Sequence, residues 1–230
     1  MATESLPLFD GDNRPGYKSL GNSGLFVSEL CLGTMTFGGD EDIWGLIGQL
    51  QQEQADELVK IALEAGVNFI DTANIYGFGA SERIVGQSLK NLGVRREDVV
   101  LATKVLGPMG ASPNARGASR GHIMSECKAS LARLQTDYID LYQIHWWDSG
   151  TPIEETLRTL DDISRLGKIR YFGCSNFTAW QACESIWTSK HLSIGSFVSV
   201  QPHYSMLHRK VEEELIPFCE KYDLGVLPYY

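Results

Sequence analysis

Four polar side chains of this sequence follow short apolar runs, and their types suit proton transfer. Asp71, Lys104 and His145 each come directly after such a run, and Tyr76 lies a few residues beyond Asp71. A tyrosine phenol can act as a general acid, but its ordinary pKa of about 10 makes it a weak one near neutral pH. A neighbouring ammonium favours the phenolate and so makes donation of the proton easier. Lys104 can supply that charge.

The other two side chains have complementary roles. A partly buried ammonium needs a counter-charge, which Asp71 can provide. His145 can donate a hydrogen bond to a carbonyl oxygen and orient it. Taken singly, a histidine after a strand or an aspartate before a loop is more often structural. The catalytic hypothesis therefore requires a fold that brings all four residues together.

The elements that would position these residues alternate between apolar, strand-like runs and amphipathic helical stretches. Strands are expected at 29–33, 67–70, 98–103, 138–144, 169–173, 197–200 and 224–227, with helices between them. Adjacent parallel strands need a helical crossover, so the pattern predicts a parallel α/β sheet, either doubly wound or closed into a barrel.

Two features favour a (β/α)8 TIM barrel. No glycine-rich fingerprint follows the first of these strands, and polar residues end nearly every strand, as a site on the carboxyl-terminal face of a barrel requires. The GFGASE run at 77–82 lacks a third glycine, so it indicates a turn and helix start rather than a phosphate loop. Runs at 17–20 and 25–27 flank GNSG and predict an N-terminal β-hairpin.

We expect a flexible tail over 1–16 and one barrel domain over 17–230. A closed eight-stranded barrel takes about 250 residues, and the seventh expected strand lies just before Tyr230. The eighth strand and last helix are therefore expected to be absent, which makes the barrel C-terminally incomplete. Within it, Thr151 is expected to cap the fourth crossover helix and Pro152 to be its first residue.

Composition excludes several classes of partner. The formal net charge of -9, without a run of Lys or Arg, argues against nucleic acid and anionic membranes. No apolar run reaches membrane-spanning length. The five cysteines lack a Cys-x-x-Cys pair, which indicates reduced thiols and a cytoplasmic protein. His203 and His208 have no partners at metal-binding spacing, so no metal site is predicted.

Three segments resemble the catalytic tetrad of the aldo-keto reductase superfamily. They are NFIDTANIYG at 68–77, ATK at 102–104 and QIH at 143–145. The resemblance spans 17–230, and LGTMTFG at 32–38 resembles most the bacterial branch related to potassium-channel β subunits. It implies an oxidoreductase that reduces a small carbonyl compound, an aldehyde or ketone, to an alcohol. The implied cofactor is NADPH, with NADH as the alternative.

Three further segments resemble the part of that family that binds the nicotinamide. They are GCSNF at 173–177, VQPHYS at 200–205 and LPY at 227–229, and they imply that cofactor is bound by Ser175, Asn176, Gln201 and Tyr229. The side-chain chemistry agrees, because amides pair with a carboxamide and an aromatic face packs against a flat ring. In that family the adenosine-phosphate segment follows this region, so the sequence does not choose between NADPH and NADH.

Two tryptophans are candidates for a substrate pocket. Trp44 lies in a long expected loop at 36–51 and Trp146 directly follows His145, although ordinary loop packing is the alternative for both. Two alternative functions stay open: a cofactor-sensing regulatory subunit with little turnover, and an inactive truncated form. Neither the physiological substrate nor the oligomeric state follows from the sequence.

Overall fold

The computed structural model describes residues 15–39 and 42–230. The tail expected over 1–16 lies outside the described residues apart from Pro15 and Gly16. The Gly16 carbonyl accepts a hydrogen bond from the backbone N–H of Glu29 at 3.0 Å.

Seven short strands form one curled sheet, and their order in the sheet is their order in the chain. Every neighbouring pair is parallel. The strands are β3 (Cys31–Gly33), β4 (Phe69–Asp71), β5 (Val100–Val105), β6 (Ile139–Ile144), β7 (Ile169–Ser175), β8 (Ser199–Gln201) and β9 (Gly225–Val226). The prediction of a partial (β/α)8 barrel with seven parallel strands is confirmed.

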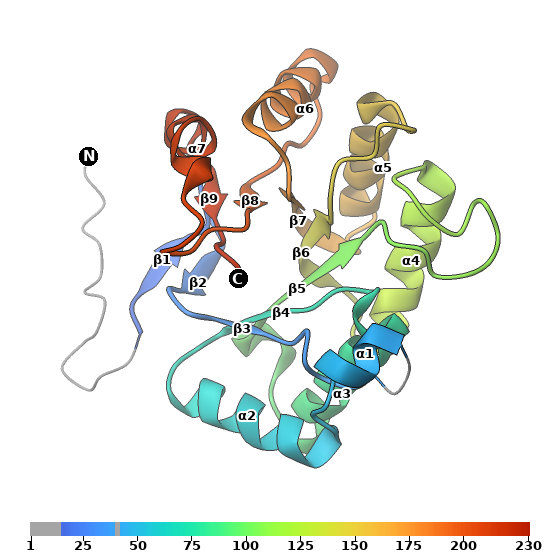
Figure 1. Ribbon diagram of the computed structural model, residues 1–230, viewed down its shortest axis with the longest axis vertical. Helices are drawn as coiled ribbons and strands as arrows, with labels where there is room; N and C mark the ends of the chain where they lie inside the picture. The colour runs from blue at the N-terminus through green and yellow to red at the C-terminus, as the bar shows by residue number, and fades with distance from the viewer. Residues whose placement is uncertain (1–14, 40–41) are drawn as a thin grey trace.

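Helices connect the strands and lie around the outside of the sheet in chain order (Figure 1). They are α2 (Gln52–Glu64), α3 (Ala80–Asn91), α4 (Arg120–Arg133), α5 (Ile153–Arg165), α6 (Ala179–Leu192) and α7 (Leu215–Tyr222), with short 3-10 turns η1 (Tyr76–Gly79), η2 (Arg96–Asp98) and η3 (Lys210–Glu212). Capping boxes begin α2 and α6, which satisfies backbone N–H groups that a helix start otherwise leaves unpaired.

The side chains of each strand alternate between two apolar layers. In β5, Leu101 and Val105 belong to the large cluster packed against the helices. Val100 and Ala102 belong to a smaller cluster inside the barrel. Because alternate residues of a strand share a face, Lys104 points into the barrel with Val100 and Ala102.

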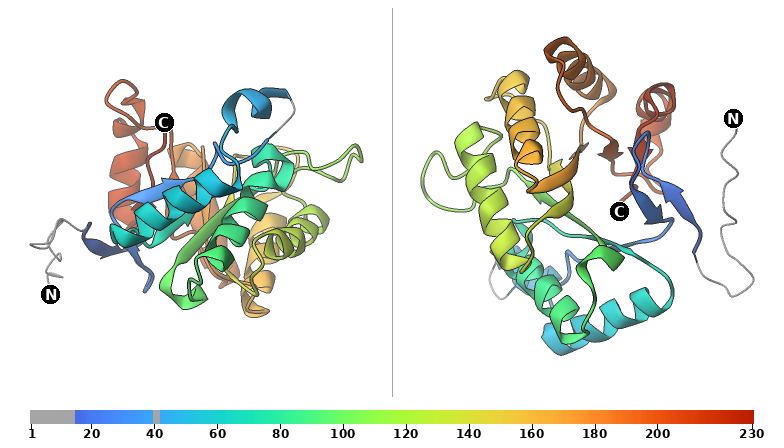
Figure 2. Two further views of the ribbon diagram at one scale, coloured as in Figure 1. Left: turned by 90° about the horizontal axis from the view of Figure 1, so that it is seen from below. Right: turned by 180° about the vertical axis from the view of Figure 1, so that it is seen from behind.

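An antiparallel hairpin, β1 (Tyr17–Ser19) and β2 (Phe26–Ser28), precedes the barrel as predicted. It contacts the end of α7 through a hydrogen bond from Asn22 N–H to the Asp223 carbonyl at 2.8 Å. Gly21 has φ +57°, and a Cβ there would lie 2.4 Å from the Val198 oxygen, so this turn needs glycine. In Figure 2 the hairpin lies at the opposite end of the barrel from the short helix α1 (Asp42–Ile47).

Two local expectations were wrong. The region 36–51, expected to be a loop, contains α1. The crossover helix α5 begins at Ile153 with Pro152 as its N-cap, because the Thr151 hydroxyl donates to Asp148 Oδ2 at 2.7 Å instead of capping the helix. No helix within the described ranges is both long enough and apolar enough to cross a membrane.

Candidate active site

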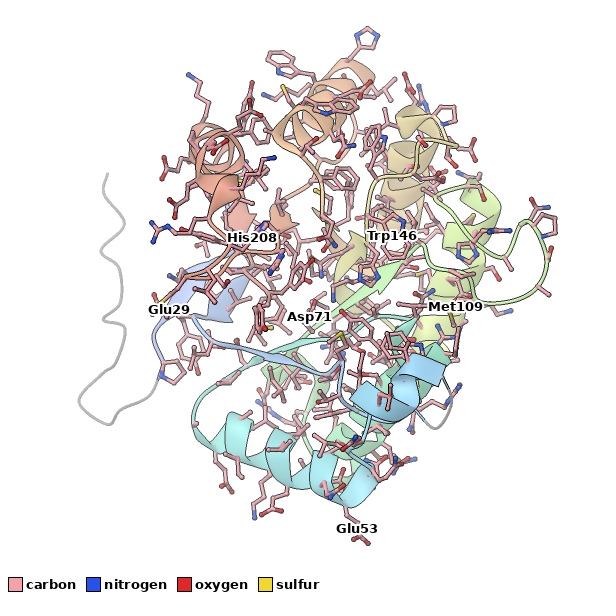
Figure 3. All side chains as sticks on the ribbon, in the orientation of Figure 1. Glu29, Glu53, Asp71, Met109, Trp146 and His208 are labelled. Carbon is pink, nitrogen blue, oxygen red and sulfur yellow. The ribbon has the colours of Figure 1, made fainter. Side chains whose placement is uncertain are left out.

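Lys104 is the centre of the polar cluster inside the barrel. Its side chain is fully buried, and its ammonium forms an ion pair with Asp71. The ammonium also donates to the Thr72 carbonyl at 2.9 Å and to the Tyr76 hydroxyl at 3.2 Å. Asp71 lies near the middle of the ring of helices in Figure 3. The fold therefore brings three of the four tetrad residues into direct contact.

The second oxygen of Asp71 is held by two amides. Asp71 Oδ1 accepts from Gln143 Nε2 at 2.9 Å and from Gln201 Nε2 at 3.1 Å. Gln143 was not predicted as a site residue. Its signal was a polar side chain in a buried strand, on the same face as the apolar Leu141. Both carboxylate oxygens thus have partners, which a buried charge requires.

Burial and Lys104 act on the Tyr76 phenol in opposite directions. Removal of the phenol from water raises the pKa of Tyr76, and the Lys104 ammonium lowers it. The net direction is upward, so the effect of burial outweighs that of the ammonium, and the sequence had indicated only the latter. Burial disfavours the charged form of Lys104 and so lowers its pKa. The Asp71 carboxylate and the Tyr76 hydroxyl favour the charged form, and the net effect is that the pKa of Lys104 is raised. Tyr76 is thus a protonated phenol beside a permanent cation.

His145 completes the tetrad as a neutral ring. Its centroid lies 5.8 Å from that of Tyr76, with the planes at 77°. Burial, with a smaller effect of Lys104, lowers the pKa of His145 to about 3. Its Nδ1 is buried and has no hydrogen-bond partner among the described residues. A neutral imidazole carries one N–H donor, so it can orient a carbonyl oxygen without competing for the proton of Tyr76.

The four residues proposed for cofactor binding lie beside the tetrad. Asn176 Nδ2 donates to the His145 carbonyl at 3.0 Å, and Asn176 Oδ1 accepts from the Tyr229 hydroxyl at 2.6 Å. The Ser175 hydroxyl donates to the Gln201 carbonyl at 2.9 Å. Asn176 has φ +57°, a conformation that asparagine tolerates better than most residues. Hydroxyl and amide groups are therefore concentrated at the carboxyl ends of β7 and β8.

This set of donors and acceptors fits a nicotinamide. A carboxamide needs both a donor and an acceptor, and Ser175, Asn176 and Gln201 offer both. Tyr229 is 40% exposed, and its ring stacks against that of His203 at a centroid distance of 5.5 Å. An aromatic ring with an accessible face can pack against a flat heterocycle. Among the described residues, no cluster of three or more His, Cys, Asp or Glu side chains could hold a metal ion.

Both candidate pocket tryptophans contact tetrad rings. The centroid of Trp44, on α1, is 5.8 Å from that of Tyr76. Trp146 is 39% exposed, and its centroid is 4.9 Å from that of His145. The two indoles therefore flank the reactive hydroxyl and imidazole and are apolar surfaces next to them.

Comparison with known proteins agrees with this geometry. The model of the Aldo/keto reductase family matches residues 29–230. A probable voltage-gated potassium channel subunit beta from Oryza sativa subsp. japonica is 39% identical over 212 residues, covering 91% of this chain and 62% of the relative. Aldo-keto reductase YhdN of Bacillus subtilis is 38% identical over 213 residues, covering 93% and 61%.

Putative aryl-alcohol dehydrogenase AAD16 of Saccharomyces cerevisiae is 34% identical over 227 residues, covering 91% of this chain and 66% of the relative. The chain spans less than two thirds of the length of these relatives. The family model covers most of the chain and confirms the resemblance drawn from the sequence. The chain belongs to the aldo/keto reductase family.

Proposed function

We propose that the complete protein reduces an aldehyde or ketone to an alcohol with NADPH, or NADH in its place, as the hydride donor. The observation that carries the proposal is the 3.2 Å contact between the Tyr76 hydroxyl and the ammonium of Lys104, which is itself paired with Asp71. A phenol held beside a permanent cation is suited to releasing its proton to a substrate oxygen.

The proposed roles follow from these contacts. Tyr76 donates its proton to the carbonyl oxygen, and the Lys104 ammonium stabilises the phenolate that remains. Asp71 keeps that ammonium charged and fixed, and the neutral His145 donates a hydrogen bond that orients the substrate oxygen. The nicotinamide supplies the hydride when it is bound. Its carboxamide would be held by Ser175, Asn176 and Gln201, and its ring would pack on Tyr229.

The indoles of Trp44 and Trp146 would form the walls of the substrate pocket. Flat apolar walls beside the reacting group favour a substrate with an aromatic or apolar group next to its carbonyl. We also propose a cytoplasmic location and a small-molecule substrate, without nucleic acid or membrane as partner. All five cysteines are unpaired, which fits a reducing compartment.

The test is a cofactor titration followed by a turnover assay of the full-length protein. NADPH and NADH are titrated by fluorescence, and consumption of the reduced cofactor is then followed with a panel of aromatic and aliphatic aldehydes and ketones. We expect tight binding of one cofactor and turnover with part of the panel. Binding of neither cofactor would overturn the assignment of the four cofactor-binding residues.

A regulatory subunit that senses the cofactor is the second candidate. It is favoured by 39% identity to proteins named as probable potassium channel subunits of Oryza sativa and Arabidopsis thaliana. The same experiment separates the two: tight cofactor binding with negligible turnover across the panel supports the regulatory role, and steady turnover supports the reductase.

A further inference from the structure

Five polar side chains, four of them buried and the fifth largely so, connect the loop that carries Tyr76 to the strand that carries Lys104. On the outer side of the sheet, Asn74 Nδ2 donates to Glu126 Oε2 at 3.0 Å. The same oxygen accepts from Arg133 Nη2 at 3.1 Å. Arg133 Nε donates to Glu82 Oε2 at 2.5 Å, and the Thr103 hydroxyl donates to Glu82 Oε1 at 2.6 Å. We call these five residues the buried relay.

The two ends of the buried relay lie next to the reactive pair. Asn74 precedes Tyr76 by two residues, and Thr103 directly precedes Lys104. The backbone N–H of Asn74 also donates to the Lys104 carbonyl at 3.1 Å. The relay therefore adds a side-chain connection, through α3 and α4, to the backbone hydrogen bonds between the two segments, which also include one from Thr72 N–H to the Ala102 carbonyl at 2.9 Å.

Its charges are well shielded from water. The side chains of Glu82, Arg133 and Glu126 are 0%, 12% and 11% exposed. Burial disfavours the charged guanidinium and so lowers the pKa of Arg133. The carboxylates of Glu82 and Glu126 favour the charged form, and the net effect is that the pKa of Arg133 is raised. The guanidinium of Arg133 lies between two carboxylates, and little water reaches any of the three groups. A group that moved away would lose a hydrogen-bond partner that water could not replace, so this arrangement is held more strictly than an ion pair at the surface.

The stem of Arg133 also lies beneath the turn that follows Tyr76. Gly79 has φ +89°, and a Cβ at this position would lie 2.5 Å from Arg133 Cδ. The backbone of η1 thus rests directly on the arginine. The relay contacts the Tyr76 segment on both sides of the tyrosine, through Asn74 before it and Gly79 after it.

We propose that the buried relay positions Tyr76 against Lys104, and so sets the rate of proton donation without contacting substrate or cofactor. This inference rests on the proposed reductase function. Its residues are positioning residues, and a displacement of about 1 Å at a reacting group can lower a rate about a hundredfold.

Asn74→Ala removes the end of the relay nearest to Tyr76. We expect kcat to fall by about ten- to a hundredfold, while the Kd for NADPH stays within about twofold, because Asn74 contacts neither ligand site. The control is Asp140→Asn, which weakens another partly buried ion pair: Asp140 Oδ2 accepts from Arg96 Nη2 at 2.5 Å and from Leu101 N–H at 2.9 Å. Asp140→Asn is expected to lower the urea midpoint and leave kcat unchanged.

Glu126 offers a rescue that a purely structural role does not predict. Both of its hydrogen bonds use Oε2, so the amide oxygen of Glu126→Gln can accept both, whereas Glu126→Met can accept neither. We expect Glu126→Gln to retain most of kcat and Glu126→Met to lose about as much as Asn74→Ala. Equal kcat losses in Asn74→Ala and Asp140→Asn, or a parallel loss of NADPH affinity in Asn74→Ala, would overturn the proposal.

A readout that needs no turnover separates this proposal from the proposed function. Fluorotyrosine is incorporated, the Tyr76 19F resonance is assigned with Tyr76→Phe, and its pH titration is compared between the parent and Asn74→Ala. Burial and Lys104 act on the pKa of Tyr76 in opposite directions, so displacement of the phenol should change that pKa in Asn74→Ala. An unchanged titration overturns the relay even if the parent is inactive, and a shift of the pKa in either direction supports it in that case too.

Discussion

The Asp71–Lys104 pair predicts a large and strongly non-additive effect on stability. Lys104→Met leaves the Asp71 carboxylate in the barrel without a counter-charge, and Asp71→Asn leaves a fully buried ammonium without one. Removal of one partner of a buried pair costs about 3–5 kcal/mol in free energy of unfolding.

The contacts that survive set where each variant falls in that range. In Lys104→Met, Asp71 keeps the amide donors of Gln143 and Gln201 at 2.9 and 3.1 Å, so we expect about 3 kcal/mol. In Asp71→Asn, Lys104 keeps the Thr72 carbonyl and the Tyr76 hydroxyl, both neutral. We expect about 4 kcal/mol there, because a full charge remains unneutralised.

The double variant Asp71→Asn/Lys104→Met contains neither unpaired charge, so it should be more stable than either single variant. Urea unfolding at pH 7, followed by circular dichroism for the parent and the three variants, measures the cycle. A double variant whose loss equals the sum of the single losses within about 0.5 kcal/mol would refute the pairing.

Two further predictions concern His145 and the buried thiols. The pKa of His145 is lowered to about 3, so below about pH 6.5 the unfolded chain binds a proton that the folded chain does not. The parent should therefore lose up to about 2 kcal/mol more than His145→Gln between pH 7 and 5 in urea titrations; equal losses would contradict the neutral ring. Burial raises the pKa of three buried thiols, to about 12 for Cys127 and about 11 for Cys219. The three thiols are those of Cys127, Cys174 and Cys219. Mass spectrometry after iodoacetamide treatment at pH 8 should find them unmodified until urea is added. Labelling of these thiols in the native protein would contradict the packing.

Much of the site could be predicted because strand ends are visible in the sequence. The apolar runs before Asp71, Lys104 and His145 marked where parallel strands end, and the shared carboxyl-terminal edge then brought the three residues together. The hairpin followed from two short runs around a glycine-rich turn. These features depend on local patterns that a single sequence records.

The parts that were not predicted depend on packing between distant segments. Glu82 was interpreted as part of a helix start, yet its side chain is fully buried. The signal was its position on the buried stripe of α3 with Val85 and Leu89. Its partner Arg133 is 51 residues away along the chain, and no local pattern specifies that contact. The balance of burial against the Lys104 charge at Tyr76 likewise needs the tertiary structure.

The most direct test of the central claim is the rate of hydride transfer in a single turnover of the full-length protein and its Tyr76→Phe variant. NADPH-loaded protein is mixed with an aldehyde that the parent reduces, and loss of cofactor absorbance is followed by stopped flow. We expect Tyr76→Phe to slow this step by about 10²–10⁴-fold, with the Kd for NADPH unchanged. A Tyr76→Phe variant that reduces the aldehyde as fast as the parent would contradict the assignment of Tyr76 as the proton donor.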